Sequence, residues 1–197
     1  KSVYVSLSYL IRIKLSGSEK YFLVKGSKIN QYQPVGGVYK LVGNKNIYKD
    51  WRASVKPDSK NLRDLRFFIK AKYLPSVLKW FKSGKDREIG IWREFQEELI
   101  ENGILTNDNF RAIQAEFLYT KEKLLSKETR FINETYHTLV YNIFSIELND
   151  QQFGELKSLE QKKIFTKKYA FVTEDEINKE CFNNSSTKIG EHAKHIL

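Results

Sequence analysis

Two apolar runs separated by a short polar turn begin the chain. Residues 4–15 are rich in β-branched and aromatic side chains, SGSEK follows at 16–20, and residues 21–24 are again apolar. Runs of this composition, bounded by turn residues, are typical of strands joined in a β-hairpin. A third extended segment is predicted over 31–35, where the ring of Pro34 fixes the backbone.

A helical period appears near the middle of the chain. Ile91, Phe95 and Leu99 recur at i, i+4 and i+8, which places them on one face of a helix. The pair Asn102-Gly103 is a typical helix end. The pattern therefore predicts a helix over 91–100.

The other expected elements are shorter. Proline is tolerated in the first turn of a helix, so Pro75 predicts a helix that continues through Phe81. Thr173-x-x-Glu176 has the form of a capping box and predicts a helix start. The remaining expectations are strands at 48–55, 66–69, 112–119, 134–148 and 169–172, and a final helix at 186–197.

This order of elements indicates an α+β fold, with helices packed on a mixed sheet as an α/β/α sandwich. The chain has 197 residues, of which 41% are hydrophobic and 14% aromatic, enough for one well-buried core. It contains no repeat or Gly/Ser linker. We therefore expect a single domain over residues 1–197.

The amino-acid composition limits which covalent links, metal sites and partners the chain can have. The single cysteine, Cys181, excludes an internal disulfide and any multi-cysteine metal site. Thirty-four Lys and Arg against 24 Asp and Glu give a net charge of +10, which favours an anionic partner such as a nucleotide, a nucleic acid or an acidic membrane surface. The same charge is also compatible with a solubilising, lysine-rich surface.

The sequence also bears on membrane-spanning segments and on how the chain begins. No run approaches the ~20 apolar residues that a membrane-spanning helix needs. The chain begins at Lys1 and contains no methionine, so we expect it to be part of a longer protein. A preceding segment with membrane helices is compatible with this.

Four carboxylates lie opposite the apolar stripe of the 91–100 helix. Glu94, Glu97, Glu98 and Glu101 are three and four residues apart, and are therefore neighbours on a helix. Magnesium takes carboxylate and phosphate oxygens, so a cation among these groups would relieve their repulsion. The alternative is a solvated acidic face compensated by nearby arginines such as Arg93.

Two segments together carry a resemblance to a known superfamily. QPVGG at 33–37 is followed later by REFQEEL at 93–99. The second segment matches the R-E-U-x-E-E part of the Nudix box, G-x5-E-x7-R-E-U-x-E-E-x-G-U, and Gly37 matches its opening glycine. The chain thus resembles the Nudix superfamily. That resemblance implies a nucleotide-handling Nudix-like sandwich, with Glu97 and Glu98 as residual metal ligands.

The chain also departs from the Nudix box. About fifty residues separate Gly37 from the helix, which predicts a long insertion at 40–84 inside the box. Lys85 stands where the box has a glutamate, and a lysine there would repel a metal cation. Gly103 lies further from the helix than the box expects. We therefore predict a binding domain without efficient hydrolysis, which requires no cofactor although magnesium remains compatible with it.

The combined signature is more specific. QPVGG, a long insertion before GKDRE-x4-REFQEEL, and a C-terminal TKIGEHAKHIL are similar to the SMODS-associated Nudix family. That resemblance implies the sensor domain of a bacterial antiphage CBASS effector, which recognises a cyclic oligonucleotide made by a CD-NTase. It also implies a homo-oligomer that disrupts the membrane, with N-terminal transmembrane helices that make this a cytoplasmic domain of an inner-membrane protein.

Three function classes stay open: a cyclic dinucleotide sensor, an active magnesium-dependent Nudix hydrolase of a nucleoside diphosphate derivative, and an RNA-binding surface. Lys85 favours the first over the second, and no basic-aromatic repeat supports the third, so we expect no nucleic acid polymer as partner. The expected ligand site combines a ring, an amide, flexible backbone and phosphate-binding arginines: Tyr32, Gln33, Gly36, Gly37, Arg52, Arg66 and Arg93.

Overall fold

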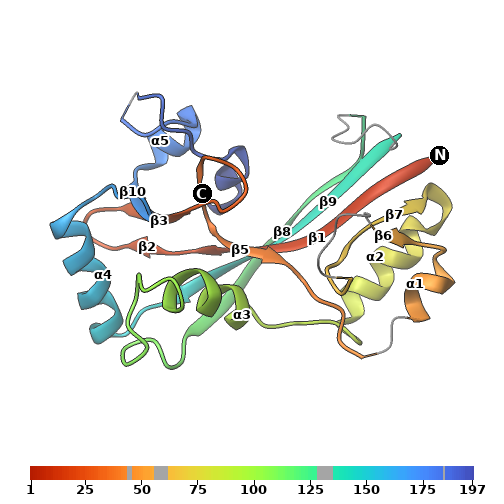
Figure 1. Ribbon diagram of the computed structural model, residues 1–197, viewed down its shortest axis with the longest axis horizontal. Helices are drawn as coiled ribbons and strands as arrows, with labels where there is room; N and C mark the ends of the chain where they lie inside the picture. The colour runs from red at the N-terminus through yellow and green to blue at the C-terminus, as the bar shows by residue number, and fades with distance from the viewer. Residues whose placement is uncertain (44–45, 56–61, 128–134, 184) are drawn as a thin grey trace. The chain divides into compact units, whose positions relative to one another are not determined.

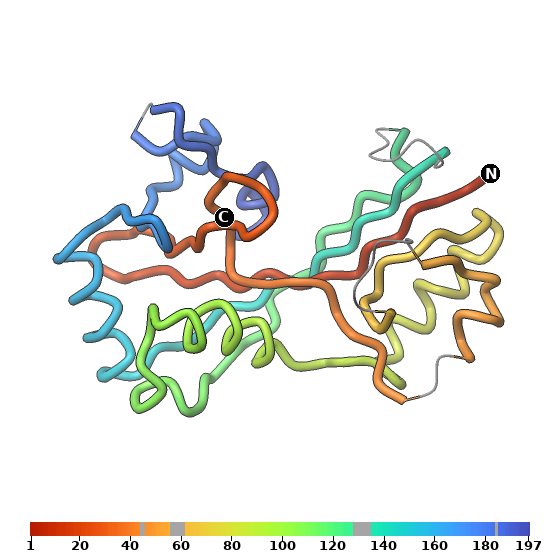
Figure 2. Tube along the Cα trace, viewed as in Figure 1, coloured from red at the N-terminus to blue at the C-terminus, as the bar shows by residue number. Residues whose placement is uncertain are grey.

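A computed structural model describes residues 1–43, 46–55, 62–127, 135–183 and 185–197. The chain forms two compact units, each made of three segments that can be followed by colour in Figure 2. The first unit contains 1–9, 37–90 and 120–142, and the second contains 10–36, 91–119 and 143–197. Among the described residues, four strands contribute to both units: β1 (Ser2–Arg12), β5 (Val35–Val38), β8 (Gln114–Ser126) and β9 (Tyr136–Glu147).

Strands and helices are mixed along the chain, which confirms the α+β class. One sheet has the order β6-β7-β1-β9-β8, with β5 (Val35–Val38) paired to β1. A second sheet has the order β10-β3-β2, with β4 (Tyr32–Gln33) paired to β3. The 13-residue strand β8 ends the first sheet, and most of its residues are exposed.

The first unit contains β6 and β7, the strands at one edge of the first sheet. Strand β7 (Arg66–Lys70) pairs antiparallel with β1, and β6 (Ser54–Val55) pairs with β7. The short helices η1 (Ala71–Tyr73) and α1 (Asn46–Asp50) and the longer α2 (Leu74–Ser83) complete it. Pro75 lies in the first turn of α2, as predicted.

The expected strand at 48–55 is wrong. Its first part is the helix α1, and only the two residues of β6 are extended. Trp51 explains the difference, because it stacks on Phe67 at 5.7 Å and meets Trp80 edge-on at 5.0 Å. Arg52, with φ of 49°, then turns the chain into the left-handed region and prevents a continuous strand.

The second unit surrounds a four-stranded antiparallel sheet made of β2 (Lys14–Leu15), β3 (Lys20–Lys25), β4 and β10 (Tyr169–Val172). Its helical segments, labelled in part in Figure 1, are α3 (Trp92–Phe95), η2 (Gln96–Ile100), α4 (Asp150–Lys162), α5 (Glu174–Lys179) and η3 (Glu191–Ile196). Thr173 and Glu176 form the predicted capping box.

Two expectations for the second unit need correction. The single strand predicted over 4–15 is divided at Ile13 into β1 and β2. The final helix does not begin at 186, because the chain there pairs with the backbone of Tyr32. The Tyr32 carbonyl oxygen accepts from the N–H of Gly190 at 2.8 Å, and the Tyr32 N–H donates to Lys188 O at 2.9 Å. This backbone pairing keeps the chain extended up to η3, which is a 3₁₀-helix.

Within the described residues, no helix has both the length and the apolar character to span a bilayer. Residues 40–84 supply most of the first unit. Their status as an insertion in a Nudix box, and the single-domain organisation, stay predictions.

Candidate functional site

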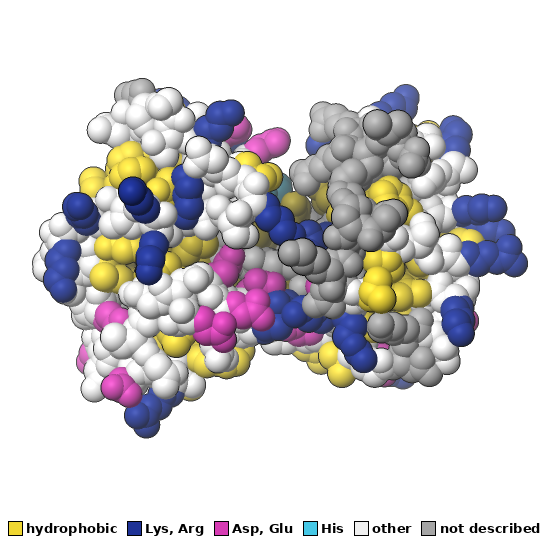
Figure 3. All heavy atoms as spheres, viewed as in Figure 1, with side chains coloured by type: hydrophobic (Ala, Val, Ile, Leu, Met, Phe, Trp, Pro, Cys, Tyr) yellow, Lys and Arg dark blue, Asp and Glu magenta, His cyan; other side chains and the backbone are white. Residues whose placement is uncertain are grey.

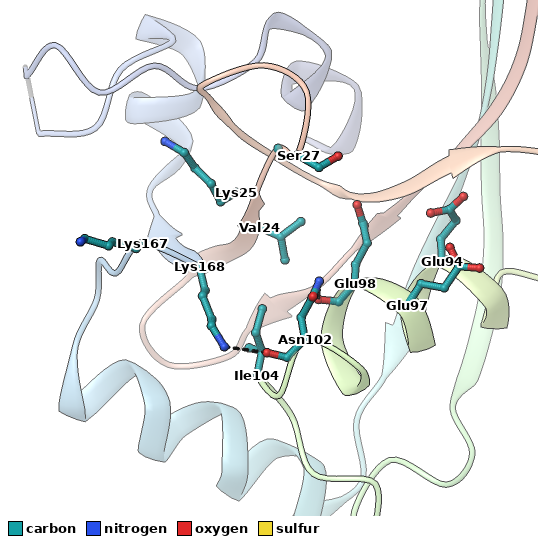
Figure 4. A pocket seen from close by; sticks show the side chains of 11 residues that line it. Val24, Lys25, Ser27, Glu94, Glu97, Glu98, Asn102, Ile104, Lys167 and Lys168 are labelled. Carbon is teal, nitrogen blue, oxygen red and sulfur yellow. Dashed lines mark hydrogen bonds between the residues drawn. The ribbon is translucent and has the colours of Figure 1, made fainter. Parts of the chain in front are cut away.

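A cavity of about 440 Å³ lies in the second unit. It opens between the end of β3 with its following loop, the helix α3–η2, and the segment that precedes β10 (Figure 4). Its lining residues are Val24, Lys25, Gly26, Ser27, Glu94, Glu97, Glu98, Asn102, Ile104, Lys167 and Lys168.

Three glutamates of the predicted acidic helix line this cavity. They project from α3–η2 in Figure 4, and acidic side chains gather over the same helix in Figure 3. The second half of the helix is a π-helix, in which the N–H of Glu101 reaches Gln96 O at 2.9 Å. This wider turn breaks the expected α-helical spacing, and Glu101 is exposed and does not line the cavity.

Glu98 joins the acidic helix to the glycine segment. Its Oε2 accepts a hydrogen bond from the backbone N–H of Gly36 at 3.0 Å. Burial raises the pKa of Glu98 to about 8, and the nearby charges of Glu94 and Glu97 raise it further, against the opposing effects of Gly36 and Arg93. The carboxyl group of Glu98 therefore holds its proton over much of the neutral range.

Glu94, Glu97 and Glu98 together form an acidic wall of the cavity, and Arg93 pairs with two of them. Its Nη1 lies 2.5 Å from Glu94 Oε1 and 3.6 Å from Glu97 Oε2. The guanidinium thus offsets the negative charge of two carboxylates. A direct contact between Arg93 and a ligand stays a prediction, and it would compete with these ion pairs.

The three glutamates of the cavity have protein partners in this structure. Glu98 is bonded to Gly36, while Glu94 and Glu97 pair with Arg93. Among the described residues, no group of three His, Cys, Asp or Glu side chains is arranged to hold a metal ion. Metal binding by Glu97 and Glu98 stays a prediction.

Lysines occupy the other side of the cavity. Lys25 ends β3, and Lys167 and Lys168 precede β10. Lys168 Nζ donates to Asn102 O at 2.7 Å, the dashed line in Figure 4. No sequence pattern singles out these lysines, because their only signal is the overall positive charge.

The predicted ligand residues Tyr32 and Gln33 are integral to β4. The Tyr32 side chain is only 2% exposed, and its ring lies 5.1 Å from that of Phe165. Gln33 pairs with Val24 of β3. Stacking of Tyr32 on a base would require the ring to leave this packing, so the structure gives it a place in the core beside the cavity.

The other predicted residues belong to the first unit. Arg66 pairs with Asp64 at 2.8 Å, and Arg52 lies in the turn after α1. Gly37 follows Gly36 in β5. Their contribution to a ligand site stays a prediction.

The glutamate nearest in sequence to the substituted box position is also in the first unit. Lys85 is exposed. Glu88 accepts from the N–H of Lys40 at 3.2 Å, and its own N–H donates to Lys40 O at 2.7 Å. Glu88 is therefore bonded twice to the backbone of Lys40, which holds these two segments together.

A family model described as SMODS-associated NUDIX domain matches residues 2–197. The chain belongs to this family. No curated protein and no solved structure matches it. The family predicted from the combined signature of QPVGG, GKDRE-x4-REFQEEL and TKIGEHAKHIL is thus confirmed over residues 2–197.

Proposed function

We propose that this SMODS-associated NUDIX domain binds a cyclic oligonucleotide, most simply a cyclic dinucleotide, as a sensor in a bacterial CBASS antiphage system, and does not hydrolyse it efficiently. The main support is the contact between Glu98 and Gly36. Glu98 bonds the backbone of the glycine segment, and Glu94 and Glu97 pair with Arg93, so all three carboxylates have protein partners. The cavity of about 440 Å³ lies in the usual range for small-molecule sites.

Occupancy of a pocket without turnover is useful only when it changes assembly or shape. The ligand must therefore prefer one state over another. A ligand with several phosphates lowers the repulsion between domains that each carry a charge of +10, and so favours self-association. In the proposed effector, N-terminal transmembrane helices are clustered by this association, and the inner membrane is disrupted.

The test is a binding screen of the purified domain against cyclic di- and trinucleotides, with and without magnesium. We expect at least one ligand to bind without the metal, and we expect sedimentation or the scattering profile to change when it does. A ligand that binds while both measurements stay unchanged would leave the signalling step without support.

The second candidate function is a magnesium-dependent hydrolase of a nucleoside diphosphate derivative. It is favoured by the fact that Glu94, Glu97 and Glu98 line one cavity. Turnover of a nucleotide panel with magnesium separates the two functions. Robust hydrolysis that is abolished by Glu97→Gln would establish the hydrolase and exclude the proposed sensor without turnover.

A further inference from the structure

The acidic and the basic side chains that line the cavity come from different elements. Carboxylates come from α3–η2, whereas amines come from the end of β3 and from the segment before β10 (Figure 4). A phosphate group is repelled by the carboxylates and attracted by the amines. For a ligand with both a phosphate and a neutral part, the lysine side is therefore the more favourable place for the phosphate.

Lys25 and Lys168 are held next to each other by the backbone. The N–H of Lys25 donates to Lys168 O at 2.8 Å. Thr166 Oγ1 accepts from the N–H groups of Lys168 and Tyr169 at 3.1 and 3.0 Å. These bonds form a side-chain turn that fixes the start of the Lys168 side chain beside β3.

A single buried ring supports both lysine segments. Lys25 Nζ lies 4.6 Å from the centre of the Tyr32 ring, within the range of a cation–π interaction. The Tyr32 hydroxyl donates to Thr166 O. Because Tyr32 is buried, it holds the two segments in place without being part of the cavity lining.

The amine of Lys168 has a partner that a phosphate can replace. It donates to Asn102 O, a neutral backbone carbonyl at the end of the acidic helix. A phosphate oxygen carries negative charge, and a hydrogen bond between two charged groups is about twice as strong as one with a neutral partner. Exchange of Asn102 O for a phosphate oxygen therefore gives the Lys168 amine a charged partner in place of a neutral one.

We propose that Lys25 and Lys168 form the phosphate subsite of this cavity, with Tyr32 as the positioning residue. Lys168 exchanges Asn102 O for a phosphate oxygen when the ligand binds. The identity of the ligand as a cyclic dinucleotide rests on the proposed function, whereas recognition of a phosphate group does not.

The test measures affinity for two probes, a cyclic dinucleotide from the screen and inorganic pyrophosphate. Lys25→Ala and Lys168→Ala should each weaken binding about tenfold or more, the size expected for a lost bond to a charged group. Lys163→Ala is the matched control, because Lys163 is exposed after α4 and does not line the cavity. It should change affinity less than about twofold. Lys168→Arg should retain most of the affinity.

The outcomes separate the two proposals. Normal binding of the cyclic dinucleotide by both lysine variants would overturn the subsite and leave the sensor function standing. Lysine-dependent binding of pyrophosphate alone would support the subsite and count against the cyclic dinucleotide. If neither probe binds the wild-type domain, the subsite is wrong.

The role of Tyr32 needs its own readout. Tyr32→Phe removes the hydrogen bond to Thr166 O and should weaken binding severalfold. Combined with Lys168→Ala, it should add little further loss, because it acts through that lysine. Fully additive losses would show that Tyr32 only supports the fold.

Discussion

The backbone N–H of Gly36 donates a 3.0 Å hydrogen bond to Oε2 of Glu98, across 62 residues of sequence. Gly36 belongs to the glycine pair of QPVGG, and Glu98 belongs to REFQEEL. The two parts of the divided signature are therefore joined directly in the second unit.

The raised pKa of Glu98 predicts a pH-dependent stability. Between its ordinary value of 4.5 and about 8, the folded protein binds this proton more tightly than the unfolded chain does. The contribution of Glu98 to the free energy of unfolding is therefore greatest below pH 4.5 and falls as pH rises to 8, by on the order of a few kcal/mol.

Glu98→Gln isolates this contribution. Glutamine keeps an oxygen acceptor for Gly36 but cannot ionise, so the variant should gain stability over wild type as pH rises from 5 to about 9. Urea unfolding at several pH values measures the difference. Glu101→Gln, at an exposed position, should follow the wild-type curve. Parallel curves for wild type and Glu98→Gln would contradict the prediction.

Two glycines should respond to alanine with opposite signs. Gly36 has φ of 151°, a conformation that a Cβ disfavours, so Gly36→Ala should destabilise the domain by about 1–3 kcal/mol. Gly154 is exposed inside α4, and nothing lies within 4 Å of the position that an alanine Cβ would take there. Gly154→Ala should therefore stabilise by about 0.5–1 kcal/mol. Thermal unfolding of both variants checks the two signs. Shifts of the melting temperature in the same direction would refute the prediction.

Glu155 should stabilise the loop that follows the acidic helix. Its carboxylate accepts from the Thr106 N–H at 2.6 Å, from Thr106 Oγ1 at 2.7 Å and from Asn109 Nδ2 at 2.6 Å. Glu155→Ala removes all three bonds and should cost about 1–3 kcal/mol. Urea unfolding gives the loss, with Glu101→Ala as the exposed control. A loss no larger than that of the control would show that these bonds contribute nothing.

Salt dependence separates a small anionic ligand from RNA. A ligand held through two phosphates should lose no more than about tenfold in affinity between roughly 50 and 200 mM salt, whereas a polymer contacting many phosphates loses far more. Titrations of a cyclic dinucleotide and of a single-stranded RNA across this range make the comparison. Tight RNA binding with the steeper slope would favour the RNA-binding alternative.

The sequence predicts elements best where apolar spacing or capping residues are clear. The helix from Ile91 is correctly placed, although no spacing indicates the π-helix after Phe95. Helix α4 is missing from the predicted elements, even though Asn149 and Gln152 form a capping box at its start. The exposed Gly154 and the narrow apolar stripe of this helix obscure it.

The candidate site is only partly predictable. The acidic wall follows from REFQEEL, because the Nudix resemblance indicates which carboxylates share a helix. Lys25 and Lys168 are distant in sequence and are brought together by backbone pairing of the kind that no local pattern encodes. Tyr32 is predicted from its place beside the glycines, and only the structure shows its burial.

The distribution of tryptophans gives the two units separate optical signals. Trp51 and Trp80 meet edge-on in the first unit, whereas Trp92 stacks on Phe95 in the second, one residue before Arg93. The chain has three tryptophans, so Trp92→Phe leaves fluorescence from the first unit alone, and replacing the other two leaves it from the acidic helix. Coincident fluorescence transitions would mean that the units unfold cooperatively, and separate transitions that each melts by itself.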